Sequence, residues 1–155
     1  MKMIDDEIII LDRKIKKFNN IIDEFKRKNN VDELLLKEQL NDILGQFEVC
    51  LKYTNISDYD CSLISAIKYA NNIKKHSHSL FDYSVSTLAL YPSDNLYPSN
   101  SLYPSAFKIW WNTLPLDNNK FKNQYDCYNE KLLNKDLQSS INKVYKIIKN
   151  GIERF

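Results

Sequence analysis

The strongest constraint on the fold is a regular spacing of large apolar residues at the start of the chain. Across residues 3–29 they recur alternately four and three positions apart. The members of this series are Ile4, Ile8, Leu11, Ile15, Phe18, Ile22 and Phe25. Such spacing places them all on one face of a long helix. Because the same spacing is typical of coiled coils, this helix can pair either within its own chain or with a second copy.

A second helix is predicted directly after the first. Asn29 and Asn30 interrupt the apolar series, and Asp32 is the expected N-cap of a helix over residues 33–53. The connection between the two helices is short. They are therefore expected to pack as an antiparallel hairpin.

Three more helices are predicted from apolar residues at helical spacing. One begins with Ser57 or Asp58 as its cap, and the C-terminal third of the chain predicts two others over residues 119–133 and 135–154. A chain of this length is expected to form one domain. The fold class is therefore predicted to be mainly α, a bundle of up-and-down helices formed by residues 1–155.

The pattern changes between the third and fourth predicted helices. Residues 82–90 and 107–114 are rich in β-branched and aromatic residues, and each predicts a short strand. We therefore expect a small β-hairpin or loop insertion within residues 82–114.

The loop of this insertion contains a repeat with a period of six residues, LYPSDN-LYPSNS-LYPSAF. Each proline disfavours helix, so the segment is predicted to be extended or a series of turns. Two interpretations are open. The repeat either lengthens a surface loop, or it forms an arm that contacts a partner protein through Tyr91, Tyr97 and Tyr103.

Composition excludes several classes of protein. Only two glycines are present, so a glycine-rich phosphate loop is excluded. Cys50, Cys61 and Cys127 have wide spacings that match no zinc pattern, and they are expected to be reduced thiols. The sequence has no apolar run long enough to span a membrane and no signal peptide, so the protein is expected to be cytoplasmic.

The segment YANNIKKHSH, residues 69–78, contains both histidines of the protein, His76 and His78. On a helix, Asn72 lies one turn before His76, so an amide and an imidazole share a face beside Lys75. These groups can move a proton and bind a phosphate, as a ribonuclease without a metal requires. The alternative is a polar helix end with no chemistry. Two histidines without a third ligand predict no metal site, and no cofactor is expected.

These residues resemble the HEPN superfamily, the higher-eukaryote and prokaryote nucleotide-binding helical domains. The resemblance rests on a helical hairpin followed by a helix that ends in a polar-Asn-x-x-x-His pattern, here Asn72 to His76. The Trp-containing stretch 107–111 and the segment 124–133 are similar to later parts of such proteins. Asn71 occupies the position at which the ribonuclease members carry arginine.

The resemblance implies a homodimer that binds RNA or a nucleotide in a bacterial or phage defence or toxin–antitoxin system. It implies His76, Asn72 and Asn71 as the catalytic positions of a metal-independent endoribonuclease. Lys74, Lys75 and His78, the basic residues around His76, would then bind RNA phosphates. Whether the protein cleaves RNA is open, because an amide at position 71 lacks the bidentate cation of an arginine.

A second function class is open on sequence grounds. The protein would then be an interaction module without enzymatic activity, such as an antitoxin, an inhibitor or an immunity partner. Its contacts would come from the first helix and from the Tyr-Pro-Ser repeat.

Overall fold

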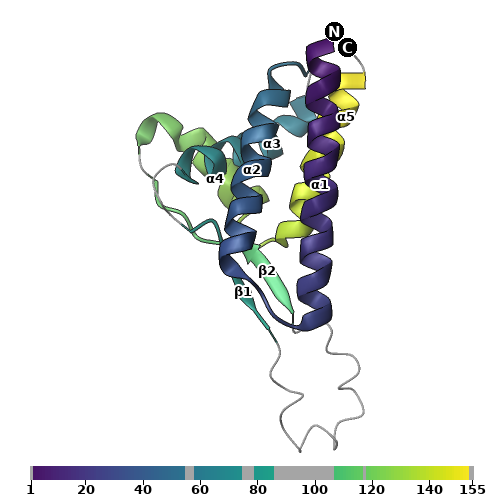
Figure 1. The fold of residues 1–155 in the computed structure, drawn as a ribbon. Coiled ribbons are helices and arrows are strands. Elements are labelled where there is room, and N and C mark those ends of the chain that lie inside the picture. The colour runs from purple at the N-terminus through teal and green to yellow at the C-terminus, as the bar shows by residue number, and fades with distance from the viewer. Residues whose placement is uncertain (1, 55–57, 75–78, 86–106, 117, 154–155) are drawn as a thin grey trace, which may run out of the picture.

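The first predicted helix is α1, which runs from Lys2 to Lys28 in the computed structural model (Figure 1). The structure describes residues 2–54, 58–74, 79–85, 107–116 and 118–153. Five members of the apolar series are buried: Leu11, Ile15, Phe18, Ile22 and Phe25. They belong to the hydrophobic core of this chain, so the apolar face of α1 packs within its own molecule.

α1 and α2 form the predicted hairpin, with α2 running from Glu33 to Leu51. Asn29 ends α1 in the left-handed conformation with φ 51°, and the N–H of Asn30 donates to the carbonyl of Phe25 at 3.1 Å. This is the closing pattern of a helix C-terminus, and asparagine adopts it readily. Asp32 is the N-cap of α2, as predicted, since its Oδ1 accepts a hydrogen bond from the N–H of Leu35 at 3.1 Å.

Replacing Asp32 by Ala is expected to lower the free energy of unfolding by about 1 kcal/mol, because the first turn of α2 loses the acceptor for an N–H group. Asp32→Asn retains a side-chain oxygen and serves as the control. Urea unfolding followed by circular dichroism measures both. Equal stability of Asp32→Ala and the wild type would contradict the assignment of the cap.

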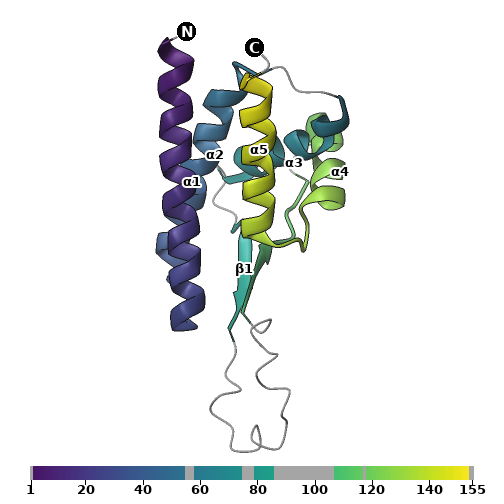
Figure 2. The same ribbon diagram turned by 90° about the vertical axis from the view of Figure 1, so that its right-hand side faces the viewer.

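The remaining helices are α3 (Asp58–Lys74), α4 (Lys122–Lys131) and α5 (Leu137–Glu153), and the short 3₁₀ helix η4 (Asn119–Phe121) leads directly into α4. The described residues are therefore mainly helical, as predicted. α1 and α5 lie side by side and run in opposite directions, while α3 and α4 pack together beyond α5 (Figure 2).

Polar contacts join α1 to α5 along their length. The Tyr145 hydroxyl donates to Asp12, and the side chains of Asn19 and Asn142 bond to each other at 2.9 Å. The pKa of Tyr145 is raised mainly by burial of its hydroxyl and, to a smaller extent, by the hydrogen bond with Asp12. These contacts fix the register between the first and last helices.

The predicted β-hairpin is confirmed, and its second strand is shorter than the predicted range 107–114. β1 (Phe81–Ser84) pairs with β2 (Lys108–Trp111) in antiparallel register, and Phe81 lies opposite Trp111. The hairpin lies at one end of the bundle (Figure 2). The repeat residues Tyr91, Tyr97 and Tyr103 lie outside the described residues.

Cys50 is a fully buried thiol on α2. Burial is the main cause that raises the pKa of this thiol from 9.0 to about 11. A rise from 9.0 to about 11 reduces the thiolate fraction near neutral pH about 100-fold. The thiol is therefore not suited to nucleophilic chemistry in the folded protein.

We expect iodoacetamide to label Cys127, which is half-buried, at pH 8 while Cys50 stays unlabelled until the chain unfolds. Mass spectrometry of the labelled peptides measures both sites. Rapid labelling of Cys50 in the native protein would contradict this placement.

The pKa of the Cys50 thiol is higher in the folded chain than in the unfolded one. The contribution of this thiol to stability is therefore fully present below pH 9 and is lost as the pH rises towards 11.

Candidate functional site

The polar segment singled out in the sequence falls at the C-terminal end of α3. Asn71, Asn72 and Lys74 lie on this helix. Lys75, His76 and His78 lie outside the described residues, so their predicted roles remain predictions. The site is therefore built from the two asparagines outwards.

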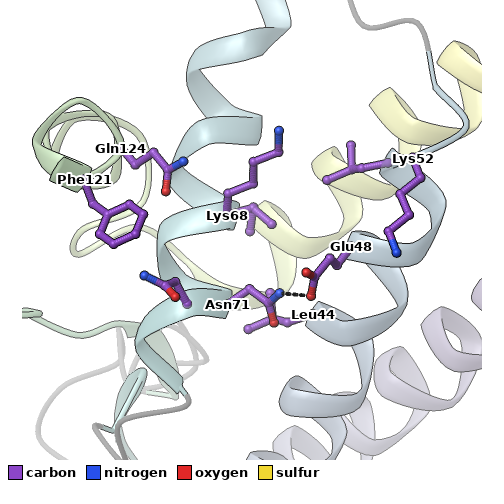
Figure 3. Close-up of a pocket in the computed structure, with 10 residues that line it drawn as sticks. Leu44, Glu48, Lys52, Lys68, Asn71, Phe121 and Gln124 are labelled. Atoms are coloured by element: carbon purple, nitrogen blue, oxygen red, sulfur yellow. Dashed lines mark hydrogen bonds between the residues drawn. The ribbon is translucent and has the colours of Figure 1, made fainter.

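Asn71 is buried at the contact between α3 and α2, with 6% of its surface exposed. Its Nδ2 donates to Glu48 Oε2 on α2 at 2.7 Å, and the two side chains point towards each other (Figure 3). The Oδ1 of Asn71 is covered and accepts no hydrogen bond from the residues that the structure describes. The opposite orientation of the amide would place this oxygen against the carboxylate, so the N–H side faces Glu48.

Lys74 also reaches α2, at a different point. Its Nζ donates to the backbone carbonyl of Asn41 at 2.9 Å. Lys74 lies three residues after Asn71, so both side chains are on the face of α3 that contacts α2. The structure therefore places the ammonium of Lys74 against the α2 backbone.

Asn71 and Asn72 line one pocket of about 420 Å³ between α2, α3 and the start of α4. Leu44, Leu51 and Ile67 form its apolar part. The polar and aromatic lining comes from residues on all three sides: Glu48, Lys52, Lys68, Asn71, Asn72, Phe121 and Gln124 (Figure 3). The volume lies within the range of small-molecule sites.

The pocket is lined by one carboxylate and two ammonium groups, from Glu48, Lys52 and Lys68. Glu48 and Lys52 are one turn apart, and Lys68 lies on the opposite helix, α3. Within the described ranges, neither Lys52 nor Lys68 forms an ion pair. Both side chains are exposed at the edge of the pocket. Two ammonium groups are thus available there for an anion.

A ligand in this pocket would meet three kinds of group. The apolar residues and the Phe121 ring can hold a flat, partly apolar ring, and the lysines can bind a negative charge. The carboxylate of Glu48 and the amides of Asn72 and Gln124 can form hydrogen bonds. Across the part of the chain that the structure describes, no group of three His, Cys, Asp or Glu side chains could hold a metal ion.

The sequence singled out Asn71 and Asn72 but not the other residues that line this pocket. Lys68 lies three and four residues before the asparagines, and this helical spacing could have placed it on their face. The spacing of Glu48 and Lys52 is likewise visible in the sequence. No local pattern shows that these helices and Phe121 meet at one pocket, because that depends on tertiary packing.

No protein-family model, curated protein or solved structure matches this chain. Among the described helices, none combines the length and the apolar character needed to cross a membrane.

Proposed function

We propose that this protein binds RNA or a nucleotide in the pocket between α2, α3 and α4. The observation that carries the proposal is the pair of lysines without carboxylate partners in the described ranges, Lys52 and Lys68, on opposite sides of a pocket that also holds Phe121. Two cations can bind phosphate, and an aromatic side chain can stack on a base, which contributes about 1–3 kcal/mol per base. The HEPN resemblance motivates the same ligand class and the setting of a defence or toxin–antitoxin system.

The position of Asn71 favours binding over cleavage. This residue stands where the resemblance expects an arginine, and in the fold its amide is buried against Glu48. Because an amide carries no charge, Asn71 cannot present a cation to a phosphate. The lysines at the edge of the pocket supply the positive charge instead. Endoribonuclease activity would depend on His76, and the resemblance would place two copies of this residue in a homodimer.

The test of binding uses fluorescence anisotropy with a labelled single-stranded RNA and the full chain. We expect Lys52→Gln/Lys68→Gln to weaken binding about tenfold or more, since two phosphate contacts are lost. Lys16→Gln/Lys17→Gln on α1 removes the same charge elsewhere and serves as the control. Equal weakening by both double variants would indicate nonspecific charge attraction and contradict the proposed site.

Cleavage is tested separately by incubating total RNA with the wild type and with His76→Ala. Cleavage that His76→Ala abolishes would support the endoribonuclease proposal. Absence of both binding and cleavage would contradict an RNA-directed function. Light scattering measures the mass in solution and tests the homodimer.

A second candidate function, protein interaction, is favoured by a groove along α1. The groove has a volume of about 480 Å³, an apolar floor of Ile21, Phe25 and Leu35, and a basic edge. The basic residues at this edge are Arg13, Lys16 and Lys17. They form no ion pair within the described ranges, whereas Glu24 in the same groove is paired with Arg27 and Lys28.

An apolar groove with a basic edge is complementary to an acidic amphipathic helix. The interaction module would bind such a helix from a partner protein, with the Tyr-Pro-Ser arm as a further contact. Capture of a partner that Lys16→Glu/Lys17→Glu abolishes and Lys52→Gln/Lys68→Gln retains would support this function. Deleting residues 90–102 tests the arm, and unchanged capture would exclude it as a contact.

A further inference from the structure

We infer that the pocket between α2, α3 and α4 selects guanine among the four RNA bases, with Glu48 as the selecting residue. This inference rests on the proposed function, because it names the base that the nucleotide pocket prefers. It follows from the way in which Glu48 is held and from the hydrogen-bond pattern of the bases.

Glu48 is a carboxylate held in place at one of its oxygens. Its Oε2 accepts from Asn71 Nδ2 at 2.7 Å, and Asn71 is itself buried between two helices. A carboxylate has about four acceptor positions on its two oxygens, so one bond leaves most of them for a ligand. The buried amide therefore limits the rotation of the carboxylate without using up its acceptors.

The nearby cations leave this carboxylate unneutralised. Lys52 lies one turn beyond Glu48 and Lys68 lines the same pocket, but neither ammonium pairs with Glu48 among the described contacts. Asn71 Oδ1 is covered and so is not a direct contact for a ligand in this conformation. Selectivity would thus come from Glu48 and not from Asn71.

Only one RNA base offers a carboxylate two adjacent donors on its pairing edge. Guanine presents its ring N1–H beside its N2 amino group, and the two bonds can form in parallel to the two carboxylate oxygens. Adenine and cytosine each present an amino group beside a ring nitrogen acceptor, and uracil presents one N–H between two carbonyl oxygens. Each of these three bases would place an acceptor near the negative charge, which is unfavourable.

The other groups of the pocket are compatible with a guanine nucleotide. The Phe121 ring offers a stacking surface, and Lys52 and Lys68 offer charge for the phosphate. These contacts are common to all nucleotides. They therefore supply affinity without selectivity and leave Glu48 as the group that distinguishes the bases.

The test measures the affinities of GMP, IMP, AMP and UMP for the full chain by calorimetry at one salt concentration. GMP is expected to bind about tenfold or more tightly than AMP or UMP. IMP lacks the N2 amino group and is expected to fall between GMP and AMP. The preference should disappear in Glu48→Gln, whose side-chain carbonyl can still accept from Asn71 but which presents a donor beside that acceptor.

The matched control is Glu38→Gln, which removes one exposed carboxylate from the same helix. It should retain the preference for GMP, and circular dichroism checks that both variants fold. Similar affinities for all four nucleotides, or a GMP preference that Glu48→Gln retains, would overturn this inference while leaving nucleotide binding in place. Failure of every nucleotide and of RNA to bind would overturn the proposed function itself.

Discussion

Replacing Trp111 by Ala is expected to lower the free energy of unfolding by about 3–5 kcal/mol. Trp111 is fully buried, and its ring meets that of Tyr128 on α4 edge-on, with 6.3 Å between the ring centroids. Its backbone N–H donates to the carbonyl of Lys135 at 3.1 Å, and its carbonyl accepts from Asn134 at 3.0 Å. The residue therefore joins the β-hairpin to the connection between α4 and α5, and its loss leaves a large cavity there.

Trp111→Phe is the informative control for this prediction. The indole Nε1 of Trp111 is buried and donates to no group within the described ranges. Phenylalanine retains much of the ring volume and removes this unpaired donor, so the two effects partly offset each other. We expect a loss of about 1–2 kcal/mol for Trp111→Phe.

Urea unfolding followed by far-ultraviolet circular dichroism measures both variants without relying on tryptophan fluorescence. A loss of this size is a large fraction of the stability of an ordinary domain, which is about 5–15 kcal/mol. Equal losses for Ala and Phe would show that ring volume does not determine the effect and would contradict the packing described above.

Replacing Asn71 by Asp is expected to destabilise the protein by about 3 kcal/mol at pH 7, because it places a buried negative charge against Glu48. The wild-type amide donates to Glu48 at 2.7 Å, and an ionised carboxylate at the same position has no proton to donate. The Asp would thus lose a hydrogen bond and gain a repulsion.

The loss should depend on pH in a defined direction. Repulsion makes the two carboxyl groups of the variant take up a shared proton at higher pH in the folded chain than in the unfolded one. The extra destabilisation is therefore small in acid, grows as the pH rises through the range in which this proton is lost, and is complete at neutral pH. Unfolding free energies of variant and wild type should converge as the pH falls towards about 4.

Asn71→Ala separates charge from hydrogen bonding in this experiment. It removes the bond to Glu48 without adding a charge, so we expect a loss of about 1 kcal/mol that varies little with pH. Thermal or urea unfolding at several pH values measures all three proteins. A loss in Asn71→Asp that is the same at pH 4 and pH 7 would contradict the close contact with Glu48.

The helices were predictable because their signals are local. The spacing of Leu11, Ile15 and Phe18 defines a face within a few turns, and the cap at Asp32 involves a residue only three positions away. The β-hairpin was also predicted, although β2 ends at Trp111 rather than continuing to residue 114. Strand length depends on pairing with the other strand, which is not visible within one segment.

The sequence by itself determined that this chain is mainly helical and that α1 has one apolar face, and it predicted a site at the two asparagines near the end of α3. Only the tertiary structure decided that the face of α1 packs within its own chain and that Asn71 bonds to Glu48, 23 residues earlier. It also brought Phe121 and Gln124 to the same pocket. The physical reason is that helical periodicity depends on neighbours within a turn, whereas the direction that each polar side chain faces depends on which other helix packs against it.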